Sequence, residues 1–352
     1  MSTERVLLTG GGGFVGSHAI RHILANTDWE IVAPVTFTHK GLSDRIRLAM
    51  DEMSDAAHRV KVVRCDLAAP ISVVTDAEFG PIDYVLNFAS ESHVDRSISH
   101  PGPFIQNNVA LMTNLLDWAR YASLKAFVQV STDEVYGPAG PEQAHREWED
   151  LHLPSNPYAA SKAAQEDIAF AYWRTYDLPI VLTNTMNIIG ETQDAEKFLP
   201  KIVATVLAGD EMVIHASADG TPGSRFYLHA RNQADGVLAA MDFALRADAN
   251  GYHPSGEGLR YSTGAHRPHR FHIVGEREVD NLTLARQVAE IVGKPLKYDL
   301  TDFHSSRPGH DLRYALDGAR MASIGWTPPV GFDESLYRTV QWMLANPEWA
   351  RA

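Results

Sequence analysis

A glycine-rich turn near the amino terminus limits what this chain can fold into more than any other feature of its sequence. The apolar or β-prone run Val6 to Thr9 leads into Gly10, Gly13 and Gly16, which form the pattern GxxGxxG. A tight strand-to-helix turn needs residues without a Cβ, and the helix that follows presents backbone N–H groups to a pyrophosphate. A P-loop is excluded, since no Lys-Ser/Thr pair follows the glycines. The pattern therefore predicts a dinucleotide-binding unit that starts at the first strand.

Short apolar runs alternate with amphipathic stretches through the first half of the chain. Their β-branched content and length favour strands, and the stretches between them favour helices. We expect strands over residues 6–9, 30–35, 60–65, 84–89, 126–131 and 180–185, and helices over 14–26, 104–122 and 158–176. This alternation is typical of a parallel sheet covered by helices on both faces. The sequence thus predicts an α/β fold with a doubly wound parallel Rossmann sheet.

The alternation ends after about residue 190, which indicates a second, smaller mixed α/β domain. Helices are expected over 200–207, 233–246, 282–293 and 333–345, with a loop at 219–223 and an extended piece at 271–274. Residues 249–270, rich in Gly, Pro, His and Arg, predict a long surface loop. We expect one domain from 1–187 with about 230–248, and the other from 188–229 with 249–352.

The charge balance and the single cysteine exclude several classes of function. Lys and Arg number 31 against 44 Asp and Glu, a net charge of -13 that would repel a nucleic-acid backbone or an anionic membrane. Cys65 is the only cysteine, so neither an intrachain disulfide nor a cysteine-based zinc site can form. Without a signal-peptide pattern or an 18-residue apolar run, we expect a cytoplasmic protein with no nucleic-acid or membrane partner.

The residues expected around the adenosine leave the choice of dinucleotide open. The second strand ends in Val35, Thr36, Phe37, Thr38, His39 and Lys40, without the acidic residue that usually binds the ribose. With no carboxylate to repel a 2′-phosphate and with Lys40 close by, NADP is an alternative to NAD. Asp66, after the third strand, is placed to accept the adenine amino group, and a plain strand-end turn is the other interpretation.

Tyr158 and Lys162 stand four residues apart near the start of a predicted helix, so both side chains project from one face. A tyrosine is a poor base at neutral pH, but a neighbouring ammonium and a nicotinamide cation favour its phenolate. Lowering its pKa from about 10 to about 7 requires roughly 4 kcal/mol. This pair predicts the base of an alcohol oxidation.

A second set of reactive groups, Thr132, Asp133 and Glu134 in STDEVYG, ends the fifth predicted strand. The carboxyl edge of a parallel sheet is where such folds bind their ligands. Two adjacent carboxyl groups there can divide general-acid and general-base work if their environments separate the pKa values. Solvated acids or a helix cap are the alternative.

Five motifs in order carry a family resemblance. GGGGFVGS, FASESHVDRSI, STDEVYG, NPYAASKA and RPGHDLRYALD with its carboxy-terminal continuation resemble the extended short-chain dehydrogenase/reductases, specifically the nucleotide-sugar 4,6-dehydratases of the dTDP-glucose 4,6-dehydratase type. The similarity covers nearly the whole chain except residues 36–60 and 249–270.

The resemblance implies a lyase that converts a nucleotide-diphosphate hexose, dTDP-glucose above all, to the 4-keto-6-deoxyhexose in deoxysugar biosynthesis. Tyr158 would take the C4 hydroxyl proton as hydride passes to the nicotinamide, with Thr132 positioning that hydroxyl and Lys162 holding the cofactor ribose. Glu134 would then remove the C5 proton while Asp133 protonates the departing C6 hydroxyl. Hydride would finally return to C6, with no net redox change.

The resemblance also implies binding sites, a division of roles and an assembly. The first domain would bind the dinucleotide, the second the nucleotide sugar, and two copies would pair through the helices at 104–122 and 158–176. Any single arginine among the substrate residues could instead be a surface ion pair. The cofactor residues would be Gly10, Gly13, Phe14, Val15, Gly16, Thr36, Asp66, Leu67, Phe88, Ala89, Ser90, Tyr158 and Lys162; the substrate residues would be Ser92, Thr132, Asn187, Glu196, Lys197, Arg225, Arg307 and His310.

Several alternatives stay open at this point. HARN at 229–232 is closer to the HAKD of GDP-mannose 4,6-dehydratases, which use NADP, so the nucleotide base is undecided. A 4-epimerase needs no acid and base beside its Tyr-Lys pair, and the related decarboxylases have Ser in place of Asp133. A non-enzymatic nucleotide sensor would not need the four groups together. We expect no metal site from His253, His266, His269 and His272, because Pro268 interrupts any helical array.

Overall fold

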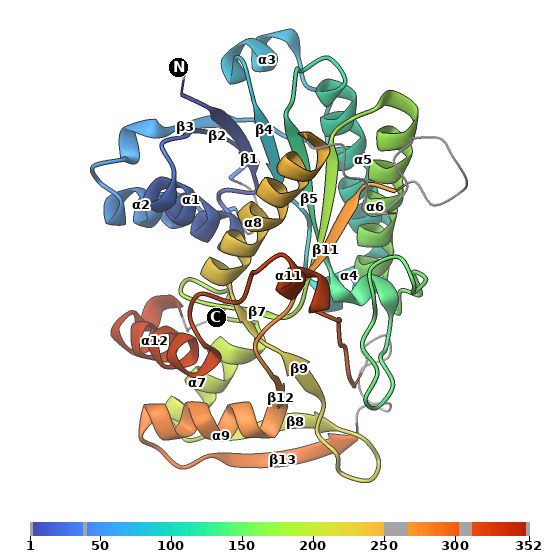
Figure 1. Ribbon diagram of the computed structural model, residues 1–352. Helices are drawn as coiled ribbons and strands as arrows, with labels where there is room; N and C mark the ends of the chain where they lie inside the picture. The colour runs from blue at the N-terminus through green and yellow to red at the C-terminus, as the bar shows by residue number, and fades with distance from the viewer. Residues whose placement is uncertain (1–2, 38–40, 250–266, 303–311, 350–352) are drawn as a thin grey trace.

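The computed structural model describes residues 3–37, 41–249, 267–302 and 312–349. Seven parallel strands form the central sheet (Figure 1). In order across the sheet they are β11 (His269–Ile273), β6 (Ile180–Thr185), β5 (Ala126–Thr132), β4 (Tyr84–Asn87), β1 (Arg5–Thr9), β2 (Glu30–Val35) and β3 (Val60–Arg64). Because β1 has β2 on one side and β4 on the other, the strand order reverses between β1 and β4, and ligands of open α/β sheets bind at such a point.

Helices cover both faces of this sheet. On one face α1 (Phe14–Asn26), α2 (Ser43–Glu52) and α8 (Ala230–Ala249) pack together, and on the other lie α3 (Val73–Phe79), α5 (Pro101–Ala119) and α6 (Pro157–Tyr176). Alternate strand residues serve the two faces: Leu8 packs toward Ile20 of α1, and Leu7 packs toward Leu115 of α5. Burial on both sides explains why each strand reads as an unbroken apolar run.

A smaller unit, drawn below the sheet in Figure 1, is built from short pairs of strands and three helices. Its core joins α7 (Phe198–Ala208), α9 (Asn281–Val292) and α12 (Phe332–Ala345) with β8 (Glu211–Ala216). Strand β8 pairs with β13 (Lys297–Asp302), β9 (Ser224–Phe226) with β12 (Glu278–Asp280), and β7 (Ile188–Ile189) with β10 (Leu228–His229). The remaining short elements are α4 (Val94–Ser99), α11 (Ala319–Ser323), η1 (Ala57–Arg59), η2 (Asp133–Tyr136) and η3 (Pro347–Trp349).

The predicted doubly wound sheet is confirmed, with one strand that the sequence did not assign to it. The extended piece expected at 271–274 is β11, which pairs with β6 from His269↔Val181 to Ile273↔Thr185. It therefore lies in the first sheet and not with the carboxy-terminal segment in which we predicted it. The expected surface loop at 249–270 falls mostly outside the described residues. Among the described helices, none is long and apolar enough to cross a lipid bilayer.

Candidate active site

The glycine turn lies at the switch point, between the end of β1 and the first turn of α1. Gly10 has φ +71°, and a Cβ there would lie 2.9 Å from both Phe88 C and Ala89 N. A Cβ on Gly16 would lie 2.1 Å from the Gly10 carbonyl oxygen, so α1 can approach the turn only without a side chain. Gly13 is the N-cap, and among the described residues no side chain caps the helix. Its first N–H groups, from Phe14 and Val15 onward, therefore suit an anionic group such as a pyrophosphate.

The residues predicted around the adenosine follow β2 and β3. Thr36 comes directly after β2, and Lys40 lies outside the described residues. Asp66 is exposed, and its Oδ1 accepts the Ala68 N–H at 2.9 Å, which closes a strand-end turn. Leu67 is buried, and its carbonyl accepts from Asn114 Nδ2 at 3.0 Å. The turn role of Asp66 is thus present, and its exposure leaves room for a contact with adenine.

The end of β4 brings Phe88, Ala89 and Ser90 against the glycine turn. The Ala89 N–H donates to Thr9 Oγ1 at 3.1 Å, and Thr9 Oγ1 donates to Asn87 Oδ1 at 2.5 Å. Ser90 Oγ donates to the Glu91 carbonyl at 3.0 Å. These bonds fasten β1 and β4 together across the switch point, where the cofactor residues were predicted.

Lys162 lies in a buried polar network that the sequence did not indicate. Its side chain is 4% exposed, and Nζ donates to the Val130 carbonyl at 2.8 Å and to Gln165 Oε1 at 2.6 Å. Gln165 in turn accepts from Gln129 Nε2 at 3.2 Å, and Asn87 Nδ2 donates to Gln129 Oε1 at 2.6 Å. Burial lowers the pKa of Lys162 to about 8. The network runs from the lysine across β5 to the strands that hold the glycine turn.

Thr132 and Asp133 meet where β5 passes into η2. Thr132 Oγ1 donates to Asp133 Oδ1 at 2.8 Å and accepts the Glu134 N–H at 3.3 Å. Asp133 is 3% exposed, and within the described part of the chain its Oδ2 makes no hydrogen bond. Burial and then the charge of Glu134 raise the pKa of Asp133 to about 7, although Thr132 and the charge of Arg225 lower it. A buried carboxyl with such a pKa holds its proton near neutral pH.

Glu134, the second carboxyl group, is only half-buried. Its Oε2 accepts from Asn156 Nδ2 at 3.0 Å, and Asn156 is the N-cap of α6. The two neighbouring carboxyl groups therefore have different surroundings, one enclosed and one held by an amide at the mouth of the helix that carries Tyr158. This is the separation that an acid and base pair needs.

Tyr158 is the second residue of α6, and its backbone N–H donates to Ser97 Oγ at 3.1 Å. In the protein alone the pKa of its hydroxyl is raised, because burial and then the charge of Glu134 disfavour the phenolate, while contact with Thr132 lowers it. The expectation that Lys162 and a nicotinamide cation together favour the phenolate concerns the cofactor-bound enzyme and stays a prediction.

The residues predicted to bind substrate come from four segments around these groups. Lys197 Nζ donates to the Ser92 carbonyl at 3.3 Å, and Glu196 pairs with His93 Nε2 at 3.3 Å. Burial lowers the pKa of Lys197, partly offset by Asp194 and then Glu134. The structure thereby brings the SHVDRS and EK segments together on the side of Glu134.

Asn187 and Arg225 occupy the connections between the sheet and the smaller unit. Asn187 is exposed, and its carbonyl accepts the Leu228 N–H at 3.0 Å. Arg225, in β9, donates from Nη1 to the carbonyls of Ser224 and Leu312 at 2.6 and 2.7 Å, and its Cζ lies 4.6 Å from the centre of the Tyr314 ring. These contacts hold Arg225 against the segments around Ser224, Leu312 and Tyr314. Arg307 and His310 lie outside the described residues.

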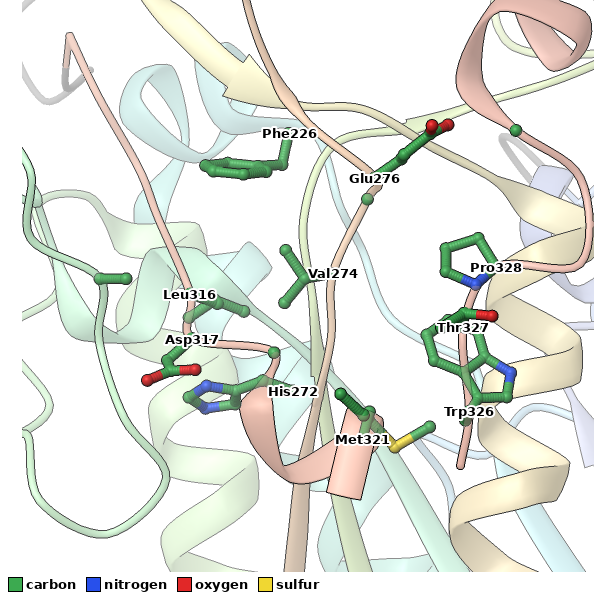
Figure 2. Close-up of a pocket in the computed structure, with 15 residues that line it drawn as sticks. Phe226, His272, Val274, Glu276, Leu316, Asp317, Met321, Trp326, Thr327 and Pro328 are labelled. Carbon is green, nitrogen blue, oxygen red and sulfur yellow. The ribbon is translucent and has the colours of Figure 1, made fainter. Parts of the chain in front are cut away.

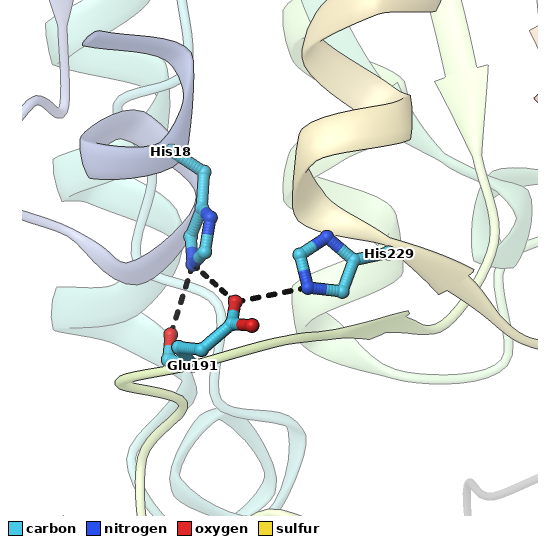
Figure 3. A group of neighbouring side chains, drawn as sticks. All are labelled: His18, Glu191 and His229. Carbon is cyan, nitrogen blue, oxygen red and sulfur yellow. Dashed lines mark hydrogen bonds and ion pairs between the residues drawn. The ribbon is translucent and has the colours of Figure 1, made fainter. Parts of the chain in front are cut away.

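His18, Glu191 and His229 gather where α1, the segment after β7 and β10 meet (Figure 3). His229 Nε2 lies 2.9 Å from Glu191 Oε2, and His18 Nε2 lies 2.9 Å from the Glu191 carbonyl oxygen. The Arg231 N–H donates to His229 Nδ1 at 3.0 Å, so the proton of this ring is on Nε2. A metal-bound histidine needs the opposite arrangement, with its outer nitrogen donating. Among the described residues, the hydrogen bonds therefore favour a hydrogen-bonded cluster, held by the Arg231 N–H, over a metal site.

Of the four histidines for which a metal site was considered, only His269 and His272 are described, and they do not face each other. His253 and His266 lie outside the described residues. His269 and His272 both belong to β11, and side chains three residues apart in a strand point to opposite faces. Accordingly the His269 ring lies 6.2 Å from that of Phe243 on α8, whereas His272 Nε2 lies 2.9 Å from Tyr136 Oη.

A pocket of about 670 Å³ opens beside β11, bounded by Val274, Phe226 and the segment around Trp326 (Figure 2). Its walls are mainly apolar. Two carboxylates at its rim are already bonded: Glu276 accepts the Phe332 N–H at 2.8 Å, and Asp317 accepts the Ala319 N–H at 2.8 Å. None of the predicted catalytic residues is among the described residues that line it.

Comparison with known proteins agrees with this arrangement. Residues 6–251 match the NAD dependent epimerase/dehydratase family. The chain is 32% identical over 345 residues to the low-salt glycan biosynthesis protein Agl12 of Haloferax volcanii, covering 97% of this chain and 99% of the relative. It is 32% identical over 365 residues to the dTDP-glucose 4,6-dehydratase of Neisseria meningitidis serogroup B, covering 98% and 95%. The solved structure of the dTDP-glucose 4,6-dehydratase DesIV of Streptomyces venezuelae, with NAD and TYD bound, matches with a TM-score of 0.80 at 30% identity over 98% of each chain.

Proposed function

Because the chain belongs to the NAD dependent epimerase/dehydratase family, we propose that it is an NAD-dependent nucleotide-sugar 4,6-dehydratase, a hydro-lyase of deoxysugar biosynthesis. The observation that carries this proposal is the contrast between Asp133 and Glu134 at the end of β5. One carboxyl is enclosed, with its pKa raised to about 7, and the other is half-buried and held by Asn156. Elimination of water needs such an acid and base side by side, and epimerisation does not.

NAD is the cofactor, and the residues present fit it. The uncapped first turn of α1 suits the pyrophosphate, and the glycine turn admits close backbone approach. Thr36 replaces the usual ribose carboxylate, which made NADP the alternative; the family match and the relatives solved with NAD support NAD. When bound, NAD would supply the hydride acceptor for oxidation at C4 of the sugar and the hydride donor for reduction at C6.

The residues of the chain divide the proton transfers among them. Tyr158 takes the proton of the C4 hydroxyl, Thr132 positions that hydroxyl, and Lys162 holds the cofactor ribose. The C4 ketone acidifies the C5 proton, which Glu134 removes while Asp133 gives its proton to the departing C6 hydroxyl, so water leaves. A proton then returns to C5 as C6 is reduced, and the 4-keto-6-deoxy sugar forms without net oxidation.

The substrate is a nucleotide-diphosphate hexose, and dTDP-glucose is the first candidate because relatives with this activity are about 30% identical over nearly the full chain. Asn187, Glu196, Lys197 and Ser92 would contact it beside the sheet. Arg225 would face its diphosphate, to which Arg307 and His310 would add further contacts. The first domain, residues 1–187 with about 230–248 and strand β11, would bind NAD, and the rest of the chain would close over the nucleotide sugar.

We further propose a cytoplasmic homodimer that pairs through α5 and α6. The two helices pack side by side, and half-buried uncharged side chains lie along them, including Val109 and Ala110 of α5 and Ala160 and Ala164 of α6. A second copy of the same helix pair would cover these positions.

Incubation of the purified protein with dTDP-glucose, GDP-mannose, UDP-glucose and UDP-glucuronate tests the proposal by mass spectrometry. Loss of one water, expected with dTDP-glucose, identifies a 4,6-dehydratase and its nucleotide base. An unchanged mass with a new sugar would identify an epimerase, and loss of carbon dioxide a decarboxylase. No turnover of any of the four would contradict the enzymatic assignment and favour a nucleotide sensor.

A further inference from the structure

One side chain, that of Asn156, links the helix that carries Tyr158 to the carboxylate of Glu134. Asn156 Oδ1 accepts the Ala159 N–H at 2.9 Å and so caps the first turn of α6. Its Nδ2 donates to Glu134 Oε2 at 3.0 Å. The side chain is 6% exposed, so both ends of one enclosed carboxamide are engaged. From this geometry we infer that Asn156 is a positioning residue, which fixes the Glu134 carboxylate for removal of the C5 proton.

The chemistry of the partners determines which way the amide points. The helix N–H can only donate, so it needs the carbonyl oxygen of Asn156, and the carboxylate can only accept, so it needs the NH₂ group. The opposite orientation would leave both contacts repulsive in an enclosed site. The amide therefore has one arrangement, and that arrangement gives Glu134 a fixed donor on the side of α6.

The position of Asn156 in the chain couples the two chemical steps. Asn156 is followed by Pro157, which stands in the first turn of α6, and then by Tyr158. Because proline fixes its own φ, the cap, the proline and the tyrosine move together as the start of one helix. Glu134 lies on a different element, η2, and its bond to Asn156 sets its place relative to Tyr158. One amide thus aligns the base for elimination with the base for oxidation.

Other titratable groups also face Glu134, and the test has to separate their effects from that of Asn156. Asp133 precedes it on η2, Tyr158 lies on α6, and Lys197 lies at the start of α7; the charge of Glu134 acts on all three. A hydrogen bond to a charged group typically changes an equilibrium or rate by about tenfold to a hundredfold when it is lost. We expect an effect of that size on elimination alone.

Two substitutions keep the cap and remove the donor. Asn156→Asp retains an acceptor for the Ala159 N–H, since Asp caps helices as well as Asn, but places a second carboxylate beside Glu134. Asn156→Ser also caps the helix, and its shorter side chain does not extend to Glu134. Both should slow C5 proton exchange with solvent deuterium about tenfold or more, while formation of the 4-keto hexose changes little.

The two variants differ in their pH dependence, which a structural role alone would not produce. Loss of the amide donor raises the pKa of Glu134 in both variants, and a neighbouring carboxylate raises it further, so the acid limb of C5 exchange should move to higher pH by more in Asn156→Asp than in Asn156→Ser. Ser72→Ala is the control for loss of a cap far from the site, because Ser72 Oγ accepts the Thr75 N–H at 3.1 Å at the start of α3. It should lower the melting temperature without changing the ratio of exchange to oxidation.

This inference rests on the proposed function, and the outcomes separate the two. If wild-type protein dehydrates the sugar and both Asn156 variants exchange the C5 proton at the wild-type rate, or lose oxidation and exchange by the same factor, Asn156 is only a helix cap and the inference is wrong. If wild-type protein dehydrates none of the nucleotide hexoses, the proposed function fails and the inference fails with it.

Discussion

The adjacent carboxyl groups of Asp133 and Glu134 differ because the chain turns between them. Asp133 is the first residue of η2, is enclosed and receives a hydrogen bond from Thr132. Glu134 lies half-buried beside Asn156. The tight helical turn thus gives two adjacent residues different environments. The pKa of only one of the two carboxyl groups needs to rise for one to act as an acid and the other as a base.

The pH dependence of elimination should reflect Asp133. With the pKa of Asp133 raised to about 7 by burial and by Glu134, its carboxyl keeps the proton at lower pH and loses it above that value. The rate of water loss should therefore fall about tenfold for each pH unit above 7. Asp133→Asn should slow water loss and remove this alkaline limb, measured as product formation at saturating substrate from pH 6 to 9. If Asp133→Asn shows the same fall in rate above pH 7, that fall belongs to the titration of another group.

Substitutions of Tyr158 and Glu134 should stop the reaction at different steps. Tyr158→Phe removes the base for the C4 hydroxyl, so no reduced nicotinamide should appear when substrate is added. Glu134→Gln should permit formation of the 4-keto hexose but block water loss, because the amide cannot take the C5 proton. Absorbance of the reduced cofactor and deuterium uptake at C5 distinguish the two, and undiminished C5 exchange in Glu134→Gln would refute the role given to Glu134.

The sequence predicted which reactive residues would share a region, and it did not predict how they are held. Thr132, Asp133 and Glu134 stand out because they follow a strand, and Tyr158 and Lys162 because of their spacing. Gln129 and Gln165 gave no signal, since glutamine on a strand or helix is usually solvent-exposed. Only their burial and their bonds to Asn87 and Lys162 reveal them. The roles of all these residues in catalysis remain predictions.

Helix α6 is joined to the edge strand β11 by buried charges. Glu166, one turn after Lys162, pairs with Arg270 of β11, and its Oε1 accepts from Asn184 Nδ2 at 2.6 Å. His152 Nε2 lies 3.2 Å from Glu166 Oε2. Arg270 also donates to Tyr136 Oη at 3.1 Å, which connects β11 to η2. The helix with Tyr158 and the turn with Asp133 therefore share one anchor at the sheet edge.

The stability of this anchor should depend on pH through His152. Burial lowers the pKa of His152, but hydrogen bonds with Asp167 and Glu166 outweigh it and raise the pKa to about 9. A group with a raised folded pKa stabilises the fold below its unfolded value, about 6.5, and that contribution is lost as the pH rises to about 9. The melting temperature of the wild type should fall between pH 7 and 9, and His152→Gln should flatten this fall. Parallel curves for the two proteins would exclude His152 as the cause.

The long elements were predictable because their periodicity is local, and the short ones were not. Strands β1 to β6 and helices α1 and α6 begin and end within about two residues of the expected bounds, whereas α5 begins at Pro101, before the expected 104. Strands β7, β9, β10 and β12 have two or three residues each, too few for a pattern, and they exist because partners distant in sequence pair with them. Helices α3, α4 and α11 were missed because they are short, and α2 was missed because polar and charged residues outnumber the apolar ones in it.

At the scale of the whole molecule, the proposed dimer makes a testable claim about α5 and α6. A carboxylate at Val109 or Ala164 would be buried without a partner in a helix pair packed against its copy, at a cost of several kcal/mol. Val109→Glu with Ala164→Glu should halve the mass measured by analytical ultracentrifugation. Val73→Glu, at a side chain that is 86% exposed on α3, makes the same kind of change elsewhere and should leave the mass unchanged. A wild type that sediments as a monomer would contradict the dimer.

The position of β11 has a consequence for how the chain acquires its shape during synthesis. The sheet that holds the glycine turn is completed by residues 269–273, which leave the ribosome after α7, β8 and α8 and before α9 and α12. Until then the backbone N–H and C=O groups on one edge of β6 have no neighbouring strand, and exposed strand edges can pair with other polypeptides. Glu166 likewise lacks its ion-pair partner until Arg270 has been translated. The sheet is therefore incomplete until these residues have been translated. A chain that stops at the end of α8 should need a chaperone to stay in solution.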